Sequence, residues 1–203
     1  MKKIITVSRQ FGSGGRSIAK ELAKRLGYDY YDSELTNKVA EETGFDPSYI
    51  ADAGEYAPGR SILSYALGSA SPHASGGHMS ASDYLWTTQS RIITELAEKG
   101  GCVIVGRCAD YILRSRDDCL NVFIHANDQY RAKRIVELYG VRDKSPQKRL
   151  EEKDGRRSVN YKYFTGREWG KIDNYHLALD SSVLGNEACV RLIMQAAEAV
   201  SSQ

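Results

Sequence analysis

Five short apolar segments along the chain predict β-strands. They cover residues 2–7, 28–32, 102–106, 121–126 and 176–182. The first, rich in β-branched residues, is too apolar for an exposed sheet edge, and 102–106 has the unbroken apolar character of a fully buried strand.

The segments between them carry apolar residues at helical spacing. Helices are predicted over 16–26, 33–43, 82–99, a segment following residue 126, and 186–200. In the first of these, Ile18, Leu22 and Leu26 share one face, and Gly27 ends the helix. The segment 46–68 has a mixed pattern, and 68–82 is small, polar and glycine-rich, which predicts a mobile loop.

Strands that alternate with helices predict an α/β fold with a mostly parallel sheet covered on both faces. Ligands of such sheets bind beyond the carboxyl ends of the strands. Three polar segments follow predicted strands at that edge: FGSGGR, YDSE and GRCADY. We therefore expect the functional site there.

Composition and charge limit the function classes. The chain has 203 residues and a net charge of +2, which fits one domain and does not indicate general nucleic-acid binding. Neither a membrane-spanning run nor a signal-peptide pattern is present, so we expect a cytoplasmic protein. The four cysteines lack metal-ligand spacing, and Cys102 and Cys189 lie in apolar surroundings that predict buried thiols.

The FGSGGRS segment predicts a phosphate-binding loop. Gly12, Gly14 and Gly15 allow backbone N–H groups to converge on an anion, at the positive end of a helix. Ser13 lies between the glycines. The alternative is an ordinary turn between a strand and a helix.

Two registers relate this loop to the consensus Gly-x-x-x-x-Gly-Lys-Ser/Thr. Counting from the strand without a gap puts Gly15 on the lysine and Arg16 on the hydroxyl residue. A shift of one residue puts Arg16 on the lysine and Ser17 on the hydroxyl residue, with Gln10 replacing the first glycine. The second register keeps a cation and a hydroxyl and is chemically preferable, although both stay open.

Two further strand ends carry candidate binding residues. Asp32 follows the second strand and either contacts a nucleotide or a metal-bound water, or caps the next helix, two compatible roles. Arg107 follows a buried strand and is placed to bind a substrate phosphate, the alternative being a structural salt bridge. Asp110 either caps the next helix or orients Arg107.

The segment 125–170 is strongly basic. Arg131 and Arg134 lie three residues apart on a helix and so lie side by side, and Lys153 and Arg157 follow on the next helix. Such a run is either a solvated face or a basic lid, and cations around a transferring phosphoryl group are what phosphoryl transfer requires.

Taken in order, IITVSRQFGSGGRSIAKELAKRLGYDYYDSEL, VIVGRCADYIL and KDGRRSVNYKYFTGREWG resemble the cytidylate kinase-like family. The resemblance covers essentially the whole chain. It implies a three-layer α/β/α P-loop fold with a five-stranded parallel sheet and a helical lid. It further implies one domain over 1–203, with an acceptor-binding region near 33–82 and a lid near 140–170.

The resemblance also implies an ATP-dependent phosphotransferase, most simply a nucleoside monophosphate kinase using Mg²⁺. Residues 12–17 would bind the donor, with Arg16 on its phosphate and Ser17 near the metal. Asp32, Arg107, Asp110 and Lys153 would bind the acceptor, and Arg131, Arg134 and Arg157 would stabilise the transferring group. No nucleic-acid or membrane partner is expected. The alternatives are a kinase of another small acceptor and a non-catalytic nucleotide- or anion-binding protein.

Overall fold

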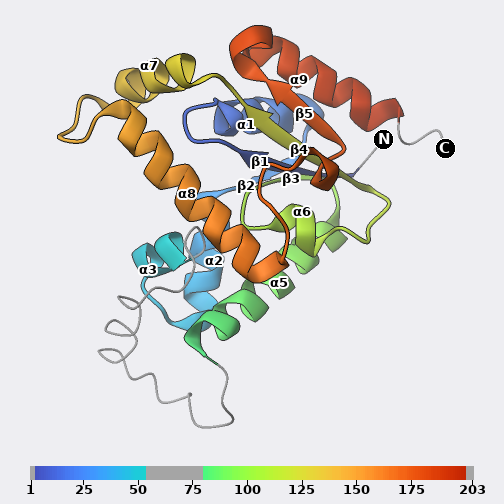
Figure 1. The fold of residues 1–203 in the computed structure, drawn as a ribbon. Coiled ribbons are helices and arrows are strands. Elements are labelled where there is room, and N and C mark those ends of the chain that lie inside the picture. The colour runs from blue at the N-terminus through green and yellow to red at the C-terminus, as the bar shows by residue number, and fades with distance from the viewer. Residues whose placement is uncertain (1–2, 54–79, 200–203) are drawn as a thin grey trace.

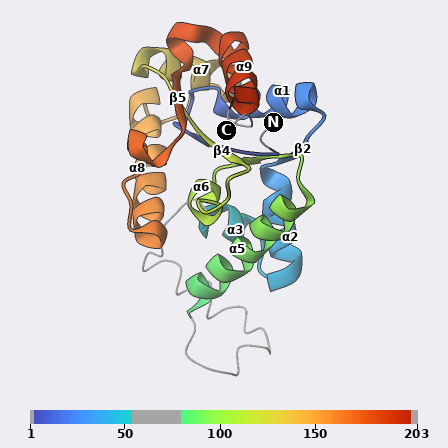
Figure 2. The same cartoon turned by 90° about the vertical axis from the view of Figure 1, so that its right-hand side faces the viewer.

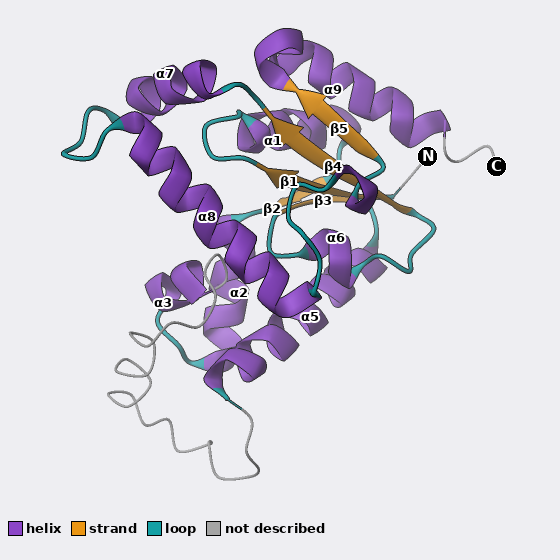
Figure 3. Ribbon diagram, in the orientation of Figure 1, coloured by secondary structure: helices purple, strands orange, loops and turns teal. Residues whose placement is uncertain are grey.

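The computed structural model describes residues 3–53 and 80–199. Its strands form one parallel sheet of five strands in the order β2-β3-β1-β4-β5 (Figures 1 and 3). The strands are β1 (Ile4–Arg9), β2 (Asp29–Tyr31), β3 (Cys102–Val105), β4 (Cys119–His125) and β5 (Leu177–Asp180). The α/β class and the five-stranded parallel sheet predicted from the sequence are thus confirmed.

Helices lie on both faces of the sheet (Figure 2). They are α1 (Gly15–Leu26), α2 (Ser33–Thr43), α3 (Pro47–Ala53), α5 (Ala81–Lys99), α6 (Ala109–Ile112), α7 (Asp128–Tyr139), α8 (Pro146–Thr165) and α9 (Ser181–Ala199), with a 3-10 turn at Ile172–Asn174. Helices α1 and α9 cover one face and α2, α5 and α6 the other, so the molecule has three layers (Figure 2). Within the described residues, no helix is long and apolar enough to cross a membrane.

The alternation of side chains along the central strand β1 creates two cores. Ile4 packs with Leu35 and other residues of α2 and α5, whereas Ile5 and Val7 pack with Ile18 and other residues of α1 and α9. A residue in a strand points opposite to its neighbours, so one strand supplies both cores. The predicted burial of Cys102 and Cys189 is confirmed.

Several strand boundaries differ by one or two residues from the sequence-based prediction, and two strands extend beyond it. Strand β1 continues to Arg9, and β4 begins at Cys119, because Ile4 to Arg9 pair continuously with Cys119 to Ile124. Pairing between strands supplies backbone hydrogen bonds that no local pattern records.

Helix boundaries follow the pattern closely, with one exception. Helix α2 has the predicted range, and α1 ends at Gly27 in the left-handed conformation. The last helical segment begins at Ser181 and contains a break at Gly185, whose φ is 72°. The glycine separates a first turn after β5 from the longer helix that was predicted. Most of the predicted loop 68–82 lies outside the described residues.

Candidate active site

A cavity of about 500 Å³ opens at the carboxyl ends of the central strands. Its basic lining residues are Arg9, Arg16, Arg107, Arg134, Lys153 and Arg157. Asp32 is the one acidic residue among the described lining residues. A concave surface with this charge imbalance raises the local concentration of anions.

The glycine loop between β1 and α1 forms one wall of the cavity. Gly12 and Gly14 have φ angles of 81°, a left-handed conformation that favours glycine. A Cβ atom on Gly12 would lie 2.8 Å from the carbonyl oxygen of Arg131, so this position has no room for a side chain. Helix α1 begins at Gly15 directly after the loop. The free N–H groups of its first turn and its dipole favour an anion at this point.

Ser13 does not face the cavity. Its side chain is fully buried, and its hydroxyl donates to the carbonyl of Gln10 at 2.9 Å. Its own carbonyl accepts from the hydroxyl of Ser181 at 2.6 Å. Ser13 therefore shapes the loop from behind.

Arg16 reaches across the cavity to β2. Its Nε lies 2.8 Å from Oδ2 of Asp32, and its Nη2 donates to Oδ1 at 3.1 Å. The side chain of Arg16 is 55% exposed. Asp32 stands at the N-cap position of α2 but makes no side-chain capping hydrogen bond. The Asp32 side chain therefore does not cap α2, and its carboxylate lines the cavity.

Ser17 lies beside Arg134, whose Nη2 donates to the Ser17 hydroxyl at 3.0 Å. Both residues line the cavity, together with Lys153 from α8. The structure thus gathers the expected donor loop and part of the basic run around one cavity.

The Arg107 loop follows β3 and has an unusual backbone. Gly106, Arg107 and Cys108 have φ angles of 71°, 57° and 53° in succession. For a non-glycine residue this conformation costs roughly 1–2 kcal/mol. Strain of this kind persists where surrounding contacts enforce it, and it clusters at functional sites.

The Arg107 guanidinium is held by three helices. Nη2 donates to Oγ1 of Thr36 at 2.7 Å, and Nη1 donates to the carbonyl of Ile50 at 2.9 Å. From α5, Gln89 accepts from Nη1 at 3.4 Å and donates to the Arg107 carbonyl at 3.3 Å. Arg107 therefore enters the cavity with a fixed orientation.

Asp110 does not line this cavity. Its carboxylate is buried and accepts from the hydroxyls of Tyr161 at 2.6 Å and Ser8 at 3.4 Å. Burial raises its pKa. The expected substrate contact of Asp110 is corrected to a structural one that joins β1, α6 and α8.

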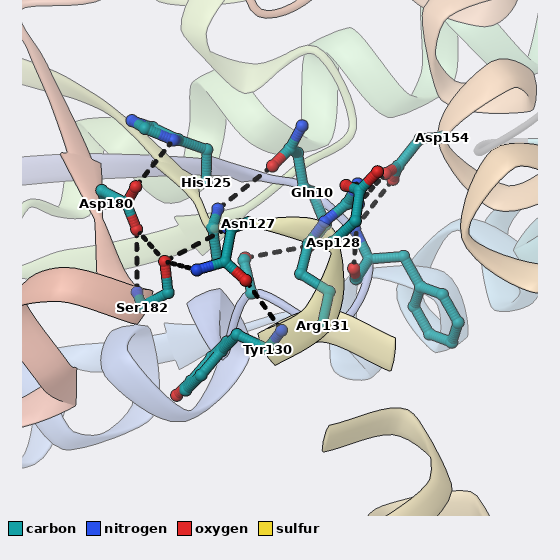
Figure 4. A network of polar contacts seen from close by, with 12 residues as sticks. Gln10, His125, Asn127, Asp128, Tyr130, Arg131, Asp154, Asp180 and Ser182 are labelled. Atoms are coloured by element: carbon teal, nitrogen blue, oxygen red, sulfur yellow. Dashed lines mark hydrogen bonds and ion pairs between the residues drawn. The ribbon is translucent and has the colours of Figure 1, made fainter. Parts of the chain in front are cut away.

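Asp154 joins the glycine loop to helices α7 and α8 (Figure 4). It accepts from the backbone N–H of Phe11 at 2.7 Å and pairs with Arg131 and, at 3.3 Å, with Arg157. Arg131 is buried and also pairs with Asp128 at 2.6 Å. Because Arg131 does not line the cavity, its expected direct role on the transferring group is corrected to support of the loop. Arg157 lines the cavity.

A second set of contacts in Figure 4 lies at the ends of β4 and β5, next to the start of the loop. Oε1 of Gln10 accepts from the N–H of Ala126 at 3.1 Å. Beyond it, the Ser182 hydroxyl accepts from Asn127 and donates to Asp180, whose pKa this contact lowers. Gln10 thereby fastens the start of the loop to the end of β4, and the Ser182 contacts join the ends of β4 and β5 to each other.

Sequence reasoning missed Arg9. It is the last residue of β1, only 7% exposed, and it lines the cavity. The available signal was a basic residue that continues a buried apolar run, directly before the glycine loop.

Residues 4–183 match the cytidylate kinase-like family. The chain belongs to that family. The resemblance noted in the sequence is therefore confirmed.

Two curated relatives are distant in sequence, but their alignments cover most of this chain. A cytidylate kinase from Aeropyrum pernix is 25% identical over 187 residues, which are 92% of this chain and 94% of the relative. A cytidylate kinase from Methanopyrus kandleri is 22% identical, over 88% and 84% of the two chains.

Solved structures share the fold. An uncharacterised protein from Eubacterium ventriosum superposes with a TM-score of 0.71 at 23% identity, over 96% of this chain and 98% of the other. A shikimate kinase from Acinetobacter baumannii reaches 0.55 at 13% identity, over 97% and 93% of the chains. A gluconokinase from Sinorhizobium meliloti also reaches 0.55, at 16% identity, over 100% and 97%. At these identities the likeness concerns the fold.

Proposed function

We propose that this protein is an ATP-dependent phosphotransferase and that its acceptor is a nucleoside monophosphate. The main support for this proposal is the cavity, which is lined by a glycine loop at a helix N-terminus and by six basic side chains. Family membership and relatives named cytidylate kinase support the choice of reaction and acceptor.

The donor phosphates would lie against residues 12–17. The backbone N–H groups at the start of α1 would bind phosphate oxygens, and Arg16 and Arg134 at the loop would add charge. On the opposite side Arg107, already oriented by Thr36 and Ile50, would bind the acceptor phosphate. Lys153 and Arg157 from α8 would complete the cationic lining as a lid closes.

An oxygen of the acceptor phosphate would attack the γ-phosphorus of ATP, and the bond to the β-phosphate oxygen would break to leave ADP. The acceptor is already an anionic nucleophile, so no strong general base is required. Positioning and positive charge around the transferring group would supply the catalysis.

The oxygen donors of the cavity fit a magnesium ion. The Ser17 hydroxyl and the Asp32 carboxylate line the cavity, and magnesium in such sites uses one or two protein oxygens together with substrate phosphates. Both oxygens now accept hydrogen bonds from Arg134 and Arg16. When bound, the ion would neutralise charge on the donor phosphates, and the two arginines would then turn from these oxygens to the phosphates.

The test is phosphate transfer from MgATP to a panel of acceptors. The panel contains CMP, dCMP, UMP, AMP and GMP, with shikimate and gluconate as non-nucleotide acceptors, and products are resolved by anion exchange. We expect a nucleoside diphosphate and ADP in equal amounts. Transfer only to a non-nucleotide acceptor would contradict the choice of acceptor, and tight nucleotide binding without turnover would favour the binding-protein alternative.

A matched pair of variants ties the activity to the cavity. Arg107→Gln removes the proposed acceptor contact and should lower kcat/KM for the monophosphate at least 100-fold. Arg114→Gln removes an exposed arginine that donates to the carbonyl of Tyr111 outside the cavity and should leave kcat/KM unchanged. Equal losses in the two variants would place the activity elsewhere.

A further inference from the structure

Arg9 has an unusual position between two loops of the site. A Cβ atom added to Gly15 would lie 2.5 Å from Cβ and 3.1 Å from Cγ of Arg9. A Cβ atom added to Gly106 would lie 2.0 Å from Nη1 and 3.0 Å from Cζ of the same side chain. The Arg9 side chain therefore runs from the start of α1 to the Arg107 loop, and a glycine at each end makes room for it.

The Arg9 side chain occupies space that a lysine side chain at position 15 would need. In the register without a gap, position 15 is the lysine of the phosphate-loop consensus. A side chain there would collide with the Cβ atom of Arg9, which cannot move aside without moving β1. Gly15 and Arg9 thus form one unit, in which the cation comes from the strand instead of the helix.

Arg16, the cation favoured by the other register, has a different environment. It is exposed and paired with Asp32. Arg9 instead lies on the cavity floor between the donor loop and the Arg107 loop, and its carbonyl accepts from Nη1 of Arg157 at 3.2 Å.

We propose that Arg9 is the catalytic cation that replaces the phosphate-loop lysine and contacts the phosphoryl group as it passes from donor to acceptor. The proposal rests on the function proposed above. The guanidinium stays protonated throughout and gives up no proton. It would donate N–H bonds to the oxygens of the transferring group, whose charge distribution changes most in the transition state.

The decisive experiment moves the cation between the two positions. Arg9→Gly removes it and should lower kcat with MgATP and the best acceptor at least 100-fold, with the acceptor KM changed less than threefold. Gly15→Lys alone should also lose activity, because the new side chain meets Arg9. The double variant Arg9→Gly/Gly15→Lys has both the space and the ammonium, and it should recover at least tenfold over either single variant.

Folding is checked separately, because Arg9 is buried. Each variant is melted by circular dichroism, and pyrophosphate and ATP binding are measured by calorimetry. A second route leaves Arg9 in place: Gly106→Ala forces its guanidinium to move and should lower kcat at least tenfold. The control is Gly27→Ala, because Gly27 has a similar positive φ, 66° compared with 71° at Gly106, and nothing lies within 4 Å of the new Cβ atom. This variant should leave kcat unchanged.

The outcomes separate this proposal from the proposed function. A wild-type protein that transfers phosphate to no acceptor contradicts the proposed function itself. An active wild type whose folded Arg9→Gly variant keeps kcat within threefold overturns the role of Arg9. A double variant no more active than either single variant overturns the claim that Arg9 replaces the lysine. If Arg9→Gly does not fold, equal kcat values for Gly106→Ala and Gly27→Ala overturn the role of Arg9.

Discussion

The arginines around the glycine loop fall into a buried set and an exposed set. Arg9, Arg131 and Arg157 are largely buried. Arg131 and Arg157 each donate to a backbone carbonyl and pair with Asp154, and the Arg9 side chain is enclosed between Gly15 and Gly106. Arg16 is exposed and bonds to Asp32. A buried arginine is fixed before any ligand arrives, whereas an exposed one can exchange its partner for a phosphate. We therefore expect the buried set to supply preorganised charge and the exposed set to supply adjustable contacts.

The largest effect is expected from breaking the buried set at Asp154. Asp154→Asn keeps an acceptor for the Phe11 N–H but leaves Arg131 and Arg157 without their shared carboxylate. We expect a loss of about 3 kcal/mol in the free energy of unfolding, measured by urea titration. The control Glu152→Gln, on the same helix, removes an exposed pair with Lys144 and should leave the free energy of unfolding nearly unchanged. Similar losses in both variants would contradict the distinction.

Arg107 extends the comparison to the acceptor side, because it too is oriented before binding. Arg107→Lys keeps the charge but cannot reproduce the planar donors that reach Thr36 and Ile50. The acceptor KM should rise roughly 10- to 100-fold, equivalent to about 2 kcal/mol, while the ATP KM stays within threefold. A rise in the ATP KM instead would reassign Arg107 to the donor. Steady-state kinetics with each substrate varied in turn provide the measurement.

A smaller effect is expected from the exposed set. Arg16→Gln breaks the ion pair with Asp32 and should lower kcat/KM by less than about tenfold, since exposed pairs contribute about 1 kcal/mol or less. The loss should shrink further in added salt. Kinetics at low and high ionic strength measure this. A 100-fold loss would instead put Arg16 in the lysine position, as the shifted register of the sequence implied.

The smallest effect concerns the pH dependence of stability near the buried set. Burial raises the pKa of Asp110, so above its ordinary pKa the folded state binds more protons than the unfolded state. The contribution of Asp110 to the free energy of unfolding therefore falls as pH rises from about 4 toward the folded-state pKa. Asp110→Asn cannot titrate, and wild type should lose stability relative to it over that interval, measured by urea unfolding at several pH values.

An aspartate whose pKa is shifted in the opposite direction serves as the control. Arg116 lowers the pKa of Asp118, so wild type should gain stability relative to Asp118→Asn as pH rises toward the ordinary pKa of an aspartate. The same direction in both variants would show that the burial of Asp110 does not govern its titration.

The sequence by itself determined the α/β class, the helix over residues 33–43 and the glycine loop, because apolar spacing and glycine conformation are local properties. It also placed Asp32 and Arg107 at the correct edge, since the ends of parallel strands meet there. Only the tertiary structure decided which cations enter the cavity. The neighbours of Arg9, Arg131 and Asp110 come from distant segments, and burial between them depends on packing that no local pattern encodes. Gly15 illustrates this: a side chain at this position has no room, because its Cβ atom would lie 2.5 Å from the Cβ atom of Arg9 on the preceding strand.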